Sequence, residues 1–164
     1  MYRLGAPDMT ETPVEPAPPS AEGGAPGLRV TVGTRGAARS DHAYPMTVQV
    51  VGVAGDVDLT TGALLAHGLT HAKDQTPPGP DPTRRVVVDV TAMTFCGAAG
   101  LGLLARAADH SRRTGTVWAL AGLTPRLTRL LATLWPTARP ALYRDRATAI
   151  TAVGLGDPWP IPAA

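Results

Sequence analysis

A run of β-branched residues in the middle of the chain does most to constrain its fold. The run reads RRVVVDV over residues 84–90. Half-exposed strands alternate apolar and polar residues, whereas a strand covered on both faces is apolar without alternation. We therefore expect residues 86–90 to form the central strand of a sheet that is layered by helices.

The segments on either side of this run predict a small α/β domain. Residues 28–32 and 46–53 alternate as strands do and predict a hairpin. The predicted order is strand, strand, helix, strand, helix, strand, helix, strand, helix, which gives a small mixed β-sheet flanked by about four helices. The remaining predicted elements are a helix capped by Thr60 or Thr61 that ends before Thr76, a helix after Phe95 that stops at Thr114 and Gly115, a strand over residues 116–121, a helix from Thr124 and Pro125 with Leu127, Leu130, Leu131 and Leu134 on one stripe, a short strand over residues 141–143, and a helix from Asp145 to Gly154.

The chain has the length of one domain with a short segment at each end. It contains 164 residues, against about 150 for a typical domain. Residues 1–27 contain six prolines and four acids against one base, without apolar periodicity, so we expect a disordered tail. This segment lacks the apolar region of a signal peptide, and no run of about 18 apolar residues predicts a membrane span. We expect a cytoplasmic protein with a folded domain over residues 28–156 and a proline-rich tail over residues 157–164.

The composition argues against several classes of site. Cys96 is the single cysteine, which excludes an internal disulfide and a cysteine-based zinc cage. Lys73 is the only lysine among 15 basic residues, and no more than two bases are adjacent. With three Trp, three Tyr and one Phe, the chain has neither a dense phosphate-binding stripe nor a stacking platform. We do not expect nucleic acid as a partner.

A glycine-rich segment after the central strand is the strongest candidate for a nucleotide site. Residues 100–105 fit the pattern G-x-G-x-x-A at the place where a dinucleotide-binding fingerprint lies. However, Leu101 and Leu104 continue a helical stripe, and the next strand ends without the Asp or Glu that would bind a ribose. We therefore expect Gly100 and Gly102 to lie within a helix and to allow it to pack closely on the sheet.

Three smaller groups have suitable chemistry for a catalytic or metal site but lack partners. His67 and His71 have i, i+4 spacing on a helix, with no glutamate between them and no evident third ligand, so we expect them to face solvent. Cys96 has no assigned histidine base and is expected to fill space at the end of a buried strand. Asp56 and Asp58 are expected to supply a helix cap and a solvated neighbour. We expect no catalytic residue, no metal and no cofactor.

Two short motifs, separated by a predicted helix and strand, carry a resemblance to a known family. The string GDVD at residues 55–58 is similar to a G-E-x-D turn, with Asp56 in the glutamate place. A second signature has D-x-S/T after a buried strand, then an aromatic, an aliphatic or Cys, and D-S-x-G leading into a helix. Its matching positions here are Asp89, Thr91, Phe95, Cys96 and Gly100. In these motifs and in the order of elements over about residues 28–154, the chain resembles the STAS domain family, in particular the bacterial anti-sigma factor antagonists.

The resemblance also indicates where this chain departs from the family. In phosphorylated members the D-S pair places a serine hydroxyl at a helix N-terminus, where a partner kinase modifies it. Here Gly97 and Ala98 take those two places, and neither can accept a phosphate. Thr91 and Thr94 are the nearest hydroxyls, but both precede Phe95 and belong to the end of the strand. The usual phosphorylation switch is therefore expected to be absent.

The function that the resemblance implies is a non-enzymatic regulatory module, a monomer or weak dimer, that binds a serine-kinase-type anti-sigma factor and so acts on transcription. Two alternatives remain: a small-molecule or nucleotide-binding α/β domain, and a STAS docking module in a signalling complex unrelated to sigma factors. The residues expected to bind the partner are Asp56, Asp58, Thr60, Cys96, Gly97, Ala98, Ala99 and Gly100.

Overall fold

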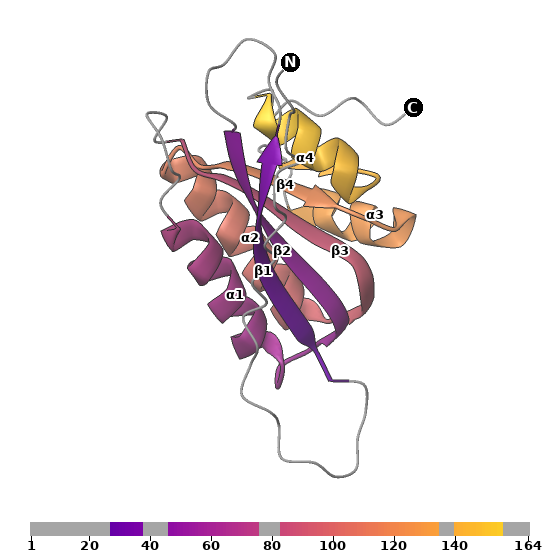
Figure 1. The fold of residues 1–164 in the computed structure, drawn as a ribbon. Helices are drawn as coiled ribbons and strands as arrows, with labels where there is room; N and C mark the ends of the chain where they lie inside the picture. The colour runs from indigo at the N-terminus through magenta and orange to yellow at the C-terminus, as the bar shows by residue number, and fades with distance from the viewer. Residues whose placement is uncertain (1–26, 38–45, 76–82, 135–139, 156–164) are drawn as a thin grey trace, which may run out of the picture.

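Five strands and four helices follow one another in the order that the sequence predicts (Figure 1). The computed structural model describes residues 27–37, 46–75, 83–134 and 140–155. The proline-rich tails predicted at the two ends lie outside the described residues, apart from Gly27. The elements are β1 (Arg29–Ala37), β2 (Met46–Val57), α1 (Gly62–Asp74), β3 (Arg85–Cys96), α2 (Ala98–Arg113), β4 (Val117–Ala121), α3 (Pro125–Leu134), β5 (Ala141–Tyr143) and α4 (Arg146–Gly154).

The strands form one mixed sheet in the order β1-β2-β3-β4-β5. β1 pairs with β2 as an antiparallel hairpin, and all later neighbours are parallel. β3 is the middle strand, and Val86, Val87 and Val88 are fully buried, which confirms the expectation of a central strand covered on both faces. β3 continues beyond the valine run to Cys96 because it stays paired with β2 past two register shifts, near Gly52 and near Gly55.

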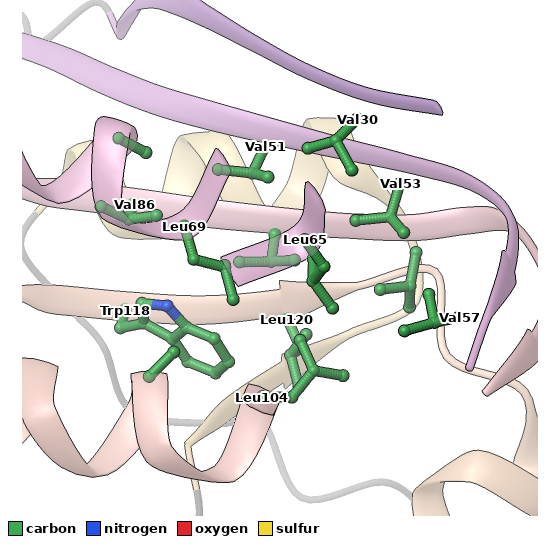
Figure 2. Packing of buried hydrophobic residues seen from close by; sticks show 14 of the residues in the cluster. Val30, Val51, Val53, Val57, Leu65, Leu69, Val86, Leu104, Trp118 and Leu120 are labelled. Carbon is green, nitrogen blue, oxygen red and sulfur yellow. The ribbon is translucent and has the colours of Figure 1, made fainter. Parts of the chain in front are cut away.

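Helices cover the two faces of this sheet unequally (Figure 1). One face packs against α1, α2 and α3, which contribute buried residues such as Leu65, Leu104 and Leu131 to the larger cluster. Among the described helices, α4 packs against the other face, through Ala149 and Val153. Among the described residues, no helix combines the length and apolar character that crossing a membrane requires. Figure 2 shows part of the larger cluster, to which the sheet contributes Val51, Val86, Trp118 and Leu120 and the helices contribute Leu65, Leu69 and Leu104.

Two helix starts confirm the predicted capping residues. The Asp145 carboxylate accepts a hydrogen bond from the backbone N–H of Thr148 at 2.8 Å. The Thr124 hydroxyl accepts from the backbone N–H of Leu127 at 3.2 Å, and Pro125 is the first residue of α3. Each cap satisfies an N–H group that the helix leaves unpaired, a contribution of about 1 kcal/mol to stability.

The leucine stripe predicted for α3 is present, but only part of it is buried. Leu127 and Leu131 are buried, whereas Leu130 and Leu134 are 44% and 46% exposed. At about 100° per residue, the four leucines span an arc of about 100°, with Leu127 and Leu131 on the buried side and Leu130 at the opposite limit of the arc. α3 therefore has an exposed apolar shoulder beside its core-facing side.

Candidate functional site

The parallel pairing of β2 and β3 brings most of the predicted site residues to one edge of the sheet. Val57 pairs with Cys96, so the two strands end side by side. The carboxyl ends of parallel strands point in the same direction, and the turns that follow them meet at that edge. The turn after Val57 leads into α1, and the turn after Cys96 leads into α2. Asp56, Asp58 and Thr60 thus lie beside residues 96–100.

The turn between β2 and α1 is organised by the Asp58 carboxylate. Its Oδ1 accepts hydrogen bonds from the backbone N–H groups of Thr60 and Thr61 at 2.8 and 2.9 Å, and from the Thr60 hydroxyl at 2.7 Å. The Thr61 hydroxyl in turn accepts from the N–H of Asp58 at 2.9 Å and lies 2.9 Å from the carbonyl oxygen of Asp56. The conformation of the turn is therefore held by hydrogen bonds from its own side chains.

The expectation that Thr60 or Thr61 caps α1 is confirmed in position only. Thr61 occupies the N-cap position, but its side chain makes no capping hydrogen bond to the helix. Its hydroxyl is directed back to the end of β2, where Asp58 and Asp56 supply closer partners. The interpretation of Asp58 as a residue that satisfies free N–H groups before the helix agrees with the structure.

These hydrogen bonds favour the charged form of Asp58. They lower the pKa of Asp58 from its ordinary 3.8 to about 2, with the Thr60 hydroxyl as the largest cause and the backbone N–H of Thr61 as the next. The carboxylate is therefore charged at all pH values at which the chain would meet a partner. It presents a fixed negative charge in the turn.

The lowered pKa of Asp58 predicts how stability depends on pH. A carboxylate whose pKa falls on folding contributes stability that is present above its unfolded value near 3.8 and is lost as the pH falls through about 2. We expect Asp58→Asn to flatten the decline in the free energy of unfolding between about pH 4 and pH 2, because the amide cannot take up the proton. Urea unfolding at a series of pH values measures this, with Thr60→Ala as a second variant that should move the decline toward higher pH. An unchanged acid decline in Asp58→Asn would show that this carboxylate is not the group responsible.

Asp56 joins β2 to β3 through its side chain. Its Oδ1 accepts a hydrogen bond from the Thr94 hydroxyl, next to the pairing of Asp56 with Phe95. Thr91 and Thr94 both lie within β3, and both are exposed. The Thr91 hydroxyl donates a hydrogen bond to the Asp89 carboxylate at 2.6 Å. The two threonines are therefore strand residues, as the sequence predicts.

The start of α2 is tied to the end of β2 but carries no side-chain cap. The backbone N–H of Gly97 donates to the carbonyl oxygen of Val57 at 2.8 Å. Gly97 is the N-cap residue and has no side chain with which to bind the first N–H groups of the helix. Ala98, the first residue of α2, is exposed. Ala98 is thus presented to solvent at the positive end of the helix dipole.

Gly100 lies inside α2 and sets how closely this helix approaches β2. A Cβ atom on Gly100 would lie 2.5 Å from Val57 Cγ1 and 2.9 Å from Cys96 Sγ, distances that no packed side chain tolerates. Gly100 and Gly102 are both helical, as expected. The expectation of close packing on the sheet is confirmed for Gly100 but is wrong for Gly102, where a Cβ would meet only the Arg106 side chain of the same helix, at 3.7 Å. The space beside Gly100 is filled by the protein's own Val57, which argues against a phosphate-binding turn at this point.

Cys96 is a packing residue with an unreactive thiol. It is half-buried and contacts the larger cluster. Burial raises the pKa of the Cys96 thiol above its ordinary value. A thiol of this kind is protonated near neutral pH, so Cys96 is a poor nucleophile. Its side chain serves instead to fill space beside Gly100.

Two large apolar side chains at the same edge were not predicted as site residues. Leu59, between Asp58 and Thr60, is 86% exposed, and Phe95, at the end of β3, is 56% exposed. Phe95 also lies against Gly97, with its Cε1 3.3 Å from where a Cβ on that glycine would be. Leu59 sits in a turn outside any apolar period, so helical or strand spacing gives no signal for it. A leucine between two polar turn residues, Asp58 and Thr60, is the sequence feature that could have indicated an exposed apolar side chain here.

The two histidines on α1 stack on each other. The rings of His67 and His71 are 6.5 Å apart at an interplanar angle of 17°, and His71 Nε2 lies 3.3 Å from Gln75 Nε2. Within the described ranges, no three His, Cys, Asp or Glu side chains gather closely enough to hold a metal ion. The pair lies on a helix face apart from the edge that carries Asp58 and Ala98.

Comparison with known proteins places this arrangement in a family. The STAS domain model matches residues 44–135, more than half of the chain. The chain belongs to the STAS domain family. The STAS match runs from just before β2 to just after α3 and includes both the turn after β2 and the start of α2. No curated protein sequence matches the chain.

Solved structures share the STAS fold at low sequence identity. The murine anion transporter Slc26a9 matches with a TM-score of 0.56 at 10% identity, over 79% of this chain and 22% of that one. A variant of RsbS from Moorella thermoacetica matches with a TM-score of 0.50 at 16% identity, over 78% of this chain and 92% of that one. A Thermotoga maritima protein proposed to be an anti-sigma factor antagonist matches with a TM-score of 0.48 at 14% identity, over 68% of this chain and 95% of that one. At these identities the likeness concerns the fold alone.

Proposed function

We propose that this STAS domain is a non-enzymatic regulatory module that binds a serine-kinase-type anti-sigma factor and thereby acts on transcription. The docking surface in this proposal consists of Asp56, Asp58, Leu59, Thr60, Phe95 and residues 96–100, and is called the edge surface below. The protein works in the cytoplasm as a monomer or weak dimer. Its activity is binding, with no cofactor and no covalent step.

The observation that carries the proposal is the exposed, uncapped start of α2 beside the Asp58 turn. Apolar anchors surrounded by polar groups are the usual composition of a specific protein interface. Leu59 and Phe95 supply such anchors, and the fixed charge of Asp58 supplies part of the polar rim. The internal hydrogen bonds of the turn hold these groups in place before binding, which lowers the ordering cost of association.

The same geometry supports a module without the family's phosphorylation switch. Gly97 and Ala98 place no hydroxyl at the start of α2. The hydroxyl of Thr94, in β3, donates a hydrogen bond to Asp56 in β2, and the hydroxyl of Thr60 donates one to Asp58. A chain of this kind binds its partner without being released by phosphorylation at the helix start.

The loss of the switch predicts the result of a phosphorylation assay. We expect incubation with a cognate kinase-type anti-sigma factor and ATP to leave residues 95–102 unmodified, because no side chain in that stretch carries a hydroxyl. Mass spectrometry of the digested chain measures the result, and Ala98→Ser provides the matched control, which should gain one phosphate. Phosphate on Thr94 of the unaltered chain would contradict the proposal, since the switch would then have moved by a few residues.

A second candidate function is a STAS docking module in an assembly unrelated to sigma factors. The fold likeness to Slc26a9, an anion transporter of which the matched part is 22%, favours this alternative because the fold also occurs within larger proteins. Capture of the bound chain from cells that produce this protein, followed by its identification, separates the two functions. An anti-sigma factor supports the first, and a partner of any other kind held at the edge surface supports the second.

A further inference from the structure

α3 carries an apolar and basic surface that the edge surface does not include. Leu130 and Leu134 are 44% and 46% exposed, one helical turn apart on the same side. Arg126, one turn before Leu130, and Arg129 are also exposed. On a helix with about 100° per residue, Leu134, Leu130 and Arg126 follow one another outward from the core-facing side, with Arg129 beyond them. These four residues are called the α3 surface below.

Among the described residues, the arginines of the α3 surface have no acidic partner. The helix reads PRLTRLLATL and contains no acidic residue. In the part of the chain that the structure describes, no carboxylate forms an ion pair with Arg126 or Arg129. By contrast, Arg112 and Arg113 on α2 both pair with Asp109 at 2.9 Å. The α3 surface therefore combines two half-exposed leucines with two positive charges that lack a counter-charge.

We propose that the α3 surface is a second docking site, and that it binds an acidic amphipathic helix of a partner protein. Apolar residues of such a helix at i and i+4 would cover Leu130 and Leu134, and glutamates or aspartates beside them would pair with Arg126 and Arg129. Charge complementarity of this kind selects the partner and speeds its association. β4 and β5 are parallel, so the connection that contains α3 returns along the sheet from the carboxyl end of β4. Leu130 and Leu134, in the second half of α3, therefore lie farther from the edge surface than Arg126 in its first turn. Two partners can then be bound at one time.

Other occupants fit the α3 surface less well. A second copy of α3 would bring two more arginines and no carboxylate, so the positive charges would remain unpaired. A membrane surface is normally bound by helices with a long apolar face that includes aromatic residues, whereas α3 exposes two leucines on a helix of 10 residues. An acidic helix satisfies both the apolar and the charged part of the surface.

Fluorescence anisotropy with a helix-stapled acidic peptide tests this proposal. The peptide has leucines at i and i+4 flanked by glutamates, and its matched control has glutamines in place of the glutamates. We expect the full chain to bind the acidic peptide at least about tenfold more tightly than the control peptide, with the difference shrinking as salt is raised. We expect Leu130→Gln with Leu134→Gln to weaken binding at least about tenfold, whereas Leu155→Gln, at a leucine that is 47% exposed elsewhere, leaves it unchanged.

The arginines and the alternatives are tested in the same system. Arg126→Gln with Arg129→Gln should abolish the preference for the acidic peptide, whereas Arg112→Gln with Arg113→Gln removes the same charge and should keep it. Ala98→Glu should not affect the peptide, so this proposal and the proposed function fail separately. Equal binding of the two peptides would overturn the proposal. Binding of the chain to phosphatidylserine vesicles, or dimerisation of the chain, would also overturn it if that binding or dimerisation were lost on substitution of Leu130 and Leu134.

Discussion

Gly122→Ala is expected to destabilise the domain by about 3 kcal/mol or more, a large share of the 5–15 kcal/mol that holds a typical domain together. Gly122 lies in the turn after β4 with a φ of 80°, a conformation that costs a residue with a side chain about 1–2 kcal/mol. A Cβ there would also lie 2.6 Å from the backbone N and 2.7 Å from the Cα of Thr91. These are backbone atoms of β3, so no rotation of a side chain relieves the overlap. Urea unfolding followed by circular dichroism measures the loss.

Gly115→Ala is the matched control for this prediction. Gly115 has a φ of 70°, but a Cβ placed on it meets no atom within 4 Å. It should therefore lose only the conformational cost, about 1–2 kcal/mol. If the two variants lost equal stability, the close approach of Gly122 to Thr91 would have no energetic weight, and β3 would not be held there as the structure shows.

The sequence predicts the frame of the fold well because the frame depends on local patterns. Four of the five residues 86–90 are valines without alternation, and this run lies in the middle strand of the sheet, covered on both faces. Asp145 and the pair Thr124 and Pro125 have the chemistry of helix starts and act as such. In these cases the pattern and the physical cause lie within a few residues of each other, so a single sequence is enough.

The sequence fails where a side chain's environment depends on a distant segment. The role of Thr61 is decided by Asp56 and Asp58 at the end of β2 rather than by the helix it precedes. β3 extends to Cys96 because β2 continues to pair with it through two register shifts. The exposure of Leu130 depends on how much of α3 the sheet can cover. Apolar periodicity gives the side of an element that prefers burial, and tertiary packing determines how much of that side is buried.

Ala98→Glu is expected to weaken partner binding at least about tenfold, or about 1.4 kcal/mol, while leaving the melting temperature nearly unchanged. A carboxylate at the first position of α2 is favoured by the helix dipole and by free N–H groups, by about 0.3–1 kcal/mol at an exposed site. The fold therefore tolerates the charge. A partner surface adapted to the small methyl group of Ala98 must instead desolvate a negative charge and accommodate a longer side chain, which costs binding energy. The variant mimics what a phosphate would do in relatives that keep the hydroxyl.

Ala147→Glu is the control for this substitution. Ala147 is an exposed alanine in the first turn of α4, and α4 packs on the opposite face of the sheet from α2. The added charge and its place in a helix are similar, but the side chain is far from the edge surface. We expect Ala147→Glu to bind the partner as the unaltered chain does.

The proposed binding through the start of α2 is tested by calorimetric titration of the unaltered chain, Ala98→Glu and Ala147→Glu against a serine-kinase-type anti-sigma factor from the same cells. We expect saturable binding by the unaltered chain and by Ala147→Glu, with and without prior incubation with ATP, and at least about tenfold weaker binding by Ala98→Glu. Equal affinities of the unaltered chain and Ala98→Glu, with all three proteins folded, would contradict this proposal, because the start of α2 would then not be the surface that the partner contacts.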